Sequence, residues 1–118
     1  MNASDLAAAL NMKVVCPGKD NAEITCGYTS DLLSDVMANA EDGCALITIQ
    51  AHVNTIAVSS LAGAAAVVVC HGHAVPDDMA EAARREGVAV LQTEHNQFNA
   101  SFLVYRLLFG TADDGLKK

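Results

Sequence analysis

The sequence has few basic residues. It holds 7 Lys and Arg against 14 Asp and Glu, which gives a formal net charge of −7 at pH 7. Proteins that bind the nucleic-acid backbone cluster Lys and Arg on one surface, because these side chains displace the counterions of the phosphates. Two of the seven basic residues stand at the C-terminal tip, and no cluster forms elsewhere. We therefore expect no nucleic-acid partner.

The sequence also lacks a long hydrophobic run. No stretch approaches the ~20 apolar residues of a transmembrane helix, and no basic region precedes a signal-type apolar core at the N-terminus. We expect no membrane association and a soluble cytoplasmic protein. The four cysteines, Cys16, Cys26, Cys44 and Cys70, are widely spaced. In a cytoplasmic α/β domain this spacing favours buried thiols over disulfides.

Common catalytic and nucleotide-binding motifs are missing. The sequence contains no GxGxxG after a strand, no GxxxxGK[ST] and no GxSxG, which excludes the usual nucleotide loops and the nucleophile elbow. Cys70 and His71 are adjacent, so on a strand they point apart and cannot act as nucleophile and base. Asp31 and Asp35 share one predicted helical turn, which indicates dipole partners on a solvated surface rather than an acid/base pair. We expect no enzymatic activity, no cofactor and no metal.

Aromatic side chains are scarce, at 4%, whereas apolar residues as a whole reach 52% and charged residues only 18%. Such a composition favours helix-on-sheet layers packed from small side chains. A chain of 118 residues has the size of one ordinary domain. We predict a single domain over residues 1–110 and a polar C-terminal tail over residues 111–118.

Three short apolar runs are typical of buried strands: residues 44–49, 65–70 and 88–93. They show no polar alternation, as expected of strands that are covered on both faces. A helix candidate follows each run, and right-handed crossovers then make the strands parallel. The predicted fold class is α/β, a layered fold with a mostly parallel central sheet built from consecutive βα units and with helices on both faces.

Capping signals predict helices over residues 29–40, 54–61, 76–87 and 97–109. Thr29 or Ser30 is the expected N-cap of the first of these helices, and Asn54 of the second. Pro76 suits a first helical turn because its φ is already fixed near the helical value.

The N-terminal third has weaker signals. We predict a short helix over residues 4–10 and strands over 13–16 and 23–26, both of which extend the sheet at one edge. At the other end of the chain, the last helix carries an aromatic stripe of Phe98, Phe102, Tyr105 and Phe109. Aromatic residues at helical spacing favour a core or a dimer interface over a cofactor site.

All four histidines follow a predicted strand. Parallel strands bring them to one edge of the sheet, where open α/β sheets bind ligands between strand ends and helix N-termini. Polar residues at three corresponding strand exits favour a binding crevice over helix capping alone. The candidate ligand-binding residues are Gln50, His52, Asn54, Cys70, His71, Gly72, His73, Thr93, His95 and Asn96.

A metal or redox site is the alternative. His71 and His73 are two residues apart, so their side chains face the same side of an extended segment. His52 would add a third nitrogen ligand and Cys70 a thiolate ligand. No H-x₃-H or C-x₂-C spacing supports such a site, and solvated loop histidines beside a buried Cys70 explain the pattern equally well. A small enzyme with a histidine base and Glu94, or a scaffold with an empty crevice, are further alternatives.

Residues 28–108 resemble the DRTGG domain family. The resemblance is carried by SDLLSDVMANA, LITIQAHVNTIAV, AAVVVCHG and GVAVLQTEHNQF, in that order. Members of the family are small α/β domains, often dimeric, that occur alone or joined to CBS pairs and phosphohydrolase-type enzymes. They are regarded as regulatory, which implies a homodimeric regulatory domain here.

The chain departs from the family's name-giving residues. Ala51 and His52 stand where the family has its Asp-Arg pair, and Cys70, His71 and Gly72 stand where Thr-Gly-Gly is expected; Gly72 and Phe98 match the pattern. Our leading hypothesis is a non-enzymatic regulatory or ligand-sensing module. It acts as a homodimer and binds a small polar or anionic metabolite at the carboxyl ends of the strands, with a protein partner in a regulatory system as a further possibility.

Overall fold

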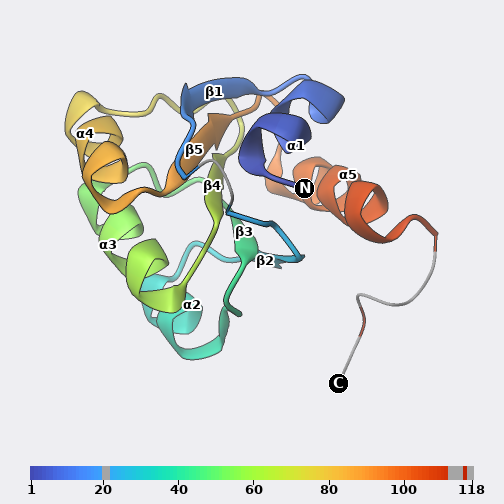
Figure 1. Ribbon diagram of the computed structural model, residues 1–118, viewed down its shortest axis with the longest axis horizontal. Helices are drawn as coiled ribbons and strands as arrows, with labels where there is room; N and C mark the ends of the chain where they lie inside the picture. Colours follow the sequence, from blue (N-terminus) through green and yellow to red (C-terminus); the bar gives the residue numbers. More distant parts are fainter. Residues whose placement is uncertain (20–21, 112–115, 117–118) are drawn as a thin grey trace.

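A five-stranded sheet crosses the molecule between two layers of helices (Figure 1). The computed structural model describes residues 1–19, 22–111 and 116. In chain order the elements are α1 (Ala3–Leu10), β1 (Lys13–Cys16), β2 (Cys26–Thr29), α2 (Leu33–Asn39), β3 (Cys44–Thr48), α3 (Val53–Ala62), β4 (Ala66–Val69), α4 (Asp77–Glu86), β5 (Ala89–Gln92) and α5 (Gln97–Phe109).

The strand order is β1-β5-β4-β3-β2. Strands β2, β3, β4 and β5 run parallel, and β1 pairs antiparallel with β5. The connections from β3 to β4 and from β4 to β5 each contain one helix, as a parallel pair requires. The layered α/β fold with a mostly parallel sheet is confirmed.

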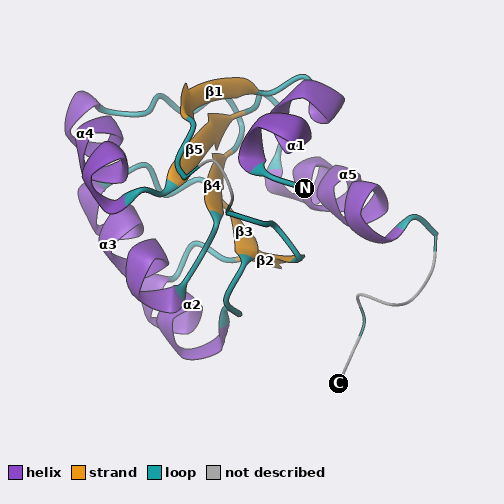
Figure 2. Cartoon of the chain, viewed as in Figure 1, coloured by secondary structure: helices purple, strands orange, loops and turns teal. Residues whose placement is uncertain are grey.

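Helices cover both faces of the sheet, also as predicted. Helices α2, α3 and α4 pack on one face, and α1 and α5 on the other (Figure 2). Alternate residues of each central strand enter the two cores: Val67 and Val69 pack toward α2, α3 and α4, while Val68 and Cys70 pack toward α1 and α5. The uninterrupted apolar runs therefore reflect burial on both sides.

The two N-terminal strands do not lie at one edge, so that prediction was wrong. Strand β1 occupies one edge and β2 the other. The second strand also begins at Cys26, where it was predicted to end. Just before it, the Ile24 amide donates to the Met1 carbonyl at 2.8 Å, and the Ile24 side chain is buried. Apolar periodicity reports such burial but does not report which strand becomes the neighbour.

The β1 edge is irregular. The register between β1 and β5 shifts between Val14 and Cys16, as in a β-bulge. Lys13 is exposed at the beginning of the same strand.

Helix α2 is shorter than predicted. It begins at Leu33, and its N-cap Leu32 makes no side-chain capping hydrogen bond. Thr29 is the last residue of β2, and the Ser30 hydroxyl accepts the Leu32 amide at 3.2 Å in the loop. The predicted cap residues therefore lie in the strand and the loop before the helix.

The remaining helices lie close to their predicted positions. Gly63 and Gly87 end α3 and α4 with φ of 77° and 71°, a left-handed conformation that glycine adopts without a Cβ clash. Phe98 and Phe102 are 81% and 55% exposed, so the aromatic stripe is not core at those two residues. Most of the predicted C-terminal tail, residues 112–115 and 117–118, falls outside the described residues. No helix in the described part of the chain has the length and apolar character to cross a membrane.

Candidate functional site

The loops that follow β3, β4 and β5 carry the four histidines. Because these strands are parallel, their carboxyl ends lie at the same edge of the sheet. His52, His71, His73 and His95 are all exposed in these loops. The structure thus brings the histidines to one edge, on three successive βα connections.

The loop after β4 is tied to the loop after β5. The His71 amide donates to the His95 carbonyl at 2.7 Å, and the Gly72 amide donates to the Thr93 carbonyl at 3.0 Å. His71 and Gly72 have φ of 60° and 66°, so this segment is a turn rather than the extended segment assumed in the metal alternative. The rings of His71 and His73 still lie 6.3 Å apart between centroids.

The exposed ring of His52 also makes a hydrogen bond that caps a helix. Its Nδ1 accepts the Asn54 amide at 3.0 Å and caps α3. Asn54, predicted as the cap, is instead the residue whose amide is capped. A neutral imidazole that accepts at Nδ1 carries its proton on Nε2, so the outer nitrogen of His52 is a hydrogen-bond donor.

The other predicted residues divide into exposed and buried groups. Asn96 is exposed and caps α5 by accepting the Asn99 amide at 2.9 Å, and Gln50 is also exposed. Thr93 is 6% exposed, and its hydroxyl accepts the His95 amide at 3.3 Å. Thr93 is therefore a buried residue whose hydrogen bond stabilises the loop.

Cys70 does not face the histidine loops. Its side chain is fully buried on the α1 and α5 side of the sheet, and its thiol donates to the Val68 carbonyl at 3.7 Å. Burial raises the pKa of the Cys70 thiol to about 11. A thiol with this pKa stays protonated at neutral pH and is a poor metal ligand or nucleophile.

Asp31 is the polar residue of this edge that sequence reasoning missed. Its Oδ1 accepts the Thr48 hydroxyl at 2.8 Å and the Ile49 amide at 2.9 Å, both at the exit of β3. The Gln97 side-chain amide, in the first turn of α5, donates to both of its oxygens at 3.0 and 3.1 Å. Asp31 therefore joins the loop before α2 to β3 and α5. Its position beside Asp35 suggested an ordinary helical carboxylate, and no motif in the sequence distinguishes it.

The Asp31 carboxylate keeps its charge in this setting. Partial burial raises its pKa. The hydrogen bonds from Ile49, Thr48 and Gln97, together with the nearby His73, lower the pKa by a larger amount, so that it lies below the ordinary value of 3.8. A fixed negative charge thus lies among the histidine loops.

The edge carries several groups that could bind a ligand. Among the described residues, no three His, Cys, Asp or Glu side chains come together in a way that could hold a metal ion. The exposed imidazoles, the backbone of the two joined loops and the first turns of α3 and α5 are the groups available to a ligand.

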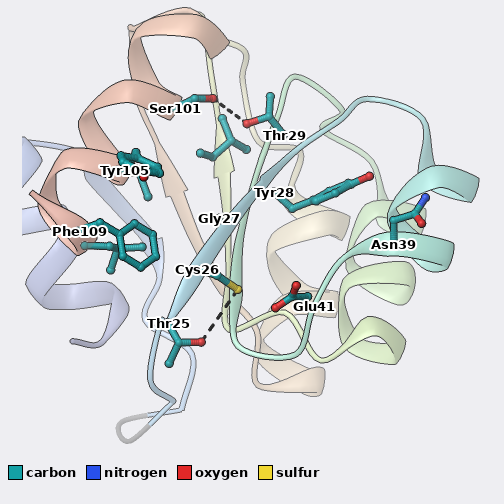
Figure 3. A pocket seen from close by; sticks show the side chains of 13 residues that line it. Thr25, Cys26, Gly27, Tyr28, Thr29, Asn39, Glu41, Ser101, Tyr105 and Phe109 are labelled. Carbon is teal, nitrogen blue, oxygen red and sulfur yellow. Dashed lines mark hydrogen bonds between the residues drawn. The ribbon is translucent and has the colours of Figure 1, made fainter. Parts of the chain in front are cut away.

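A separate hollow of about 510 Å³ lies along β2, away from the histidine loops. Figure 3 shows β2 between Ser101, Tyr105 and Phe109 of α5 on one side and Asn39 and Glu41 on the other. None of the ten predicted site residues lines it. We call this hollow the β2 groove. It escaped sequence reasoning because the predicted position of β2 in the sheet was wrong.

Comparison of the whole fold gives a clear match. A solved structure of the CBS and DRTGG domains of the regulatory region of Clostridium perfringens pyrophosphatase superposes with a TM-score of 0.67 over 87% of this chain, at 15% sequence identity. The chain has a DRTGG-like fold. The resemblance inferred from the sequence is therefore confirmed at the level of the fold.

The match covers 45% of the Clostridium perfringens chain, so this chain spans less than half of it. That protein was solved with its activator, diadenosine tetraphosphate. No family model matches the present sequence, and no curated protein does.

Proposed function

We propose that this DRTGG-like chain is a non-enzymatic regulatory module that senses a small polar or anionic metabolite at the carboxyl ends of its strands. The observation that carries the proposal is the set of four exposed histidines on three adjacent loops. Imidazole donates to or pairs with anionic groups and changes its charge near physiological pH. Action as a homodimer in the cytoplasm and contact with a protein partner belong to the same proposal.

The details of two loops support a ligand with acceptor groups. His52 uses Nδ1 to cap α3, so the Nε2–H of this exposed residue at the helix N-terminus is not needed for the cap. The first turn of α5 begins at Asn96 on a neighbouring connection. Helix N-termini and imidazole donors together favour phosphate or carboxylate groups. Because the structural neighbour was solved with a dinucleotide activator, nucleoside polyphosphates are the first ligands to test.

The metal or redox alternative has less support. It required His52, Cys70, His71 and His73 to act together, but the Cys70 side chain is fully buried in the core beside α1 and α5, whereas the three histidines are exposed. The described residues also provide no three-ligand group. We therefore propose the ligand-sensing function alone.

A thermal-shift series tests the proposal. Diadenosine tetraphosphate, ATP, AMP and a panel of carboxylate metabolites are added one at a time, and the melting temperature is measured. A ligand at 100 times its Kd stabilises the native state by about 2.7 kcal/mol, which for a domain of this size raises the melting temperature by about 10 °C. If no ligand in the panel changes the melting temperature, the proposal is wrong.

Two variants assign the response to the histidine loops. His52→Asn keeps a side-chain oxygen that can cap α3 but removes Nε2, and His71→Asn keeps a residue that tolerates a left-handed φ. Both should fold and lose most of the ligand-induced shift. Arg84→Ala, an exposed change on α4, is the matched control and should respond like wild type. The homodimer is tested separately by light scattering, which should give twice the chain mass of 12.3 kDa.

A further inference from the structure

Strand β2 is the last strand of the sheet and has one edge without a partner strand in the described part of the chain. At the end of the strand, the Ser30 amide donates to the Ile47 carbonyl of β3 at 3.2 Å. Peptide groups of a parallel strand alternate between its two neighbours. Those of Gly27 and Thr29 are therefore directed away from β3, where a further strand could pair with them.

The β2 groove surrounds this free edge on both faces of the sheet. Toward α5, the rings of Tyr105 and Phe109 lie 5.0 Å apart between centroids, tilted by 53°, and form an aromatic wall (Figure 3). The Thr29 and Ser101 hydroxyls lie 2.6 Å apart and close one end. This half of the groove suits apolar side chains of an added strand.

Gly27 opens the floor of the same half. It has no side chain, and a Cβ placed there would lie 3.8 Å from Val104 and 4.0 Å from Ile47. A methyl group would therefore fit in ordinary contact, and the glycine leaves room for an incoming side chain above these residues. Its φ is not positive, so backbone conformation does not require a glycine at this position.

The other half of the groove is acidic. Glu41 lines it, its carboxylate makes no hydrogen bond or ion pair with any described residue, and none of the described lining residues is Lys or Arg. Asp35 lies behind it, where its carboxylate accepts the Tyr28 hydroxyl at 2.8 Å and the Asn39 amide at 2.9 Å. These bonds orient Tyr28 and Asn39 and leave the Glu41 carboxylate available to a cation.

We propose that the β2 groove binds an extended peptide segment of a partner protein, which adds a strand beside β2 with apolar side chains toward α5 and Lys or Arg toward Glu41. A two-sided groove centred on a free strand fits a chain whose side chains alternate between the two faces. Charge complementarity favours a basic partner over a second copy, because a second copy would bring its own Glu41 and a net charge of −7 to the contact.

The test uses a blocked synthetic peptide, acetyl-Thr-Val-Lys-Val-Lys-Val-Thr-amide, and the full chain. Binding is measured by isothermal titration calorimetry and by protection of Cys26, which lines the groove, against alkylation. We expect saturable binding and slower alkylation. The same peptide with Glu in place of Lys, and one N-methylated at alternate residues to remove its strand hydrogen bonds, should bind much more weakly.

Two variants locate the binding. Glu41→Gln should weaken binding about two- to fivefold, the range of an exposed ion pair, and reduce its dependence on salt. Gly27→Val should abolish binding by filling the floor, while Gly27→Ala folds normally and retains part of it. Glu81→Gln, on α4 across the sheet, is the matched control and should bind like wild type. Circular dichroism and the melting temperature confirm that each variant is folded.

Three results would overturn the proposal. The first is no binding of the lysine peptide at concentrations up to about 1 mM, the weakest affinity of interest. The second is equal binding of the lysine, glutamate and N-methylated peptides. The third is a homodimer that Gly27→Val dissociates and the peptide does not displace, because a second copy would then occupy the groove.

Discussion

Removal of the Asp31 side chain tests how the histidine edge is held together. In Asp31→Ala, the Thr48 hydroxyl, the Ile49 amide and the Gln97 amide all lose their common acceptor. Thr48 is fully buried, so its hydroxyl cannot turn to bulk water. The exit of β3 and the first turn of α5 lose their direct connection in this variant.

The expected loss of stability follows from these three contacts. A buried donor left without an acceptor costs about 1–3 kcal/mol. Solvent near the partly exposed carboxylate weakens its charged hydrogen bonds, which favours the lower half of that range for each contact. Thr48 also keeps one bond, because its hydroxyl oxygen accepts the Gln50 amide at 3.0 Å. The partly exposed Gln97 amide can turn to water, so the other two contacts account for the loss, and we expect Asp31→Ala to lower the free energy of unfolding by about 2–4 kcal/mol.

Urea denaturation followed by far-UV circular dichroism measures this loss, with an unchanged m-value as the check on two-state behaviour. Asp31→Asn is the informative companion, because Thr48 and Ile49 both bond to Oδ1, and an amide oxygen can replace it. Asp31→Asn should lower the free energy of unfolding by less than about half of the loss in Asp31→Ala. A loss below about 1 kcal/mol for Asp31→Ala, or equal losses for the two variants, would refute the role assigned to these hydrogen bonds.

Three further predictions concern titration, thiol reactivity and backbone conformation. Because the folded-state pKa of Asp31 is lowered from 3.8, its contribution is present above that pH and is lost as the pH falls below it. Wild type should therefore lose more stability than Asp31→Asn between about pH 5 and pH 2, measured by urea midpoints; equal losses would contradict the assignment. Under native conditions iodoacetamide should modify Cys26 before Cys44 and Cys70, since burial raises the pKa of the last two thiols to about 12 and about 11; mass spectrometry identifies the order, and early modification of Cys70 would show that the core opens. Gly72→Ala should destabilise by about 1–2 kcal/mol because φ is 66° there, whereas Gly27→Ala, at a position without positive φ, should not; calorimetric melting compares the two.

Sequence patterns were sufficient for the centre of this fold. The apolar runs predicted β3, β4 and β5 because strands covered on both faces have no polar alternation, and the placement of His52 and His71 followed from parallel strand direction. The prediction that Cys70 is a buried free thiol is also correct, because this residue ends one of the apolar runs. These features depend on local periodicity, which a single sequence contains.

Features that depend on distant partners were not predictable in the same way. Strand β2 could have joined either edge, since its four residues carry no information about which neighbour they pair with. Asp31 was predicted as a helical surface residue because its acceptor role requires Gln97, which is far away in the sequence. The pairing of β2 and the role of Asp31 are decided by tertiary packing. The cap of α3 by His52 rather than Asn54 is a local contact, and it was missed because a histidine ring is an uncommon cap.

The irregular β1 edge has a consequence for assembly. A sheet with two regular free edges can add strands at both ends and grow into a fibre. Here the register shift between Val14 and Cys16 and the exposed Lys13 make the β1 edge a poor template for pairing. A chain that accepts a strand only at β2 forms a finite complex, and its sheet cannot propagate from one molecule to the next.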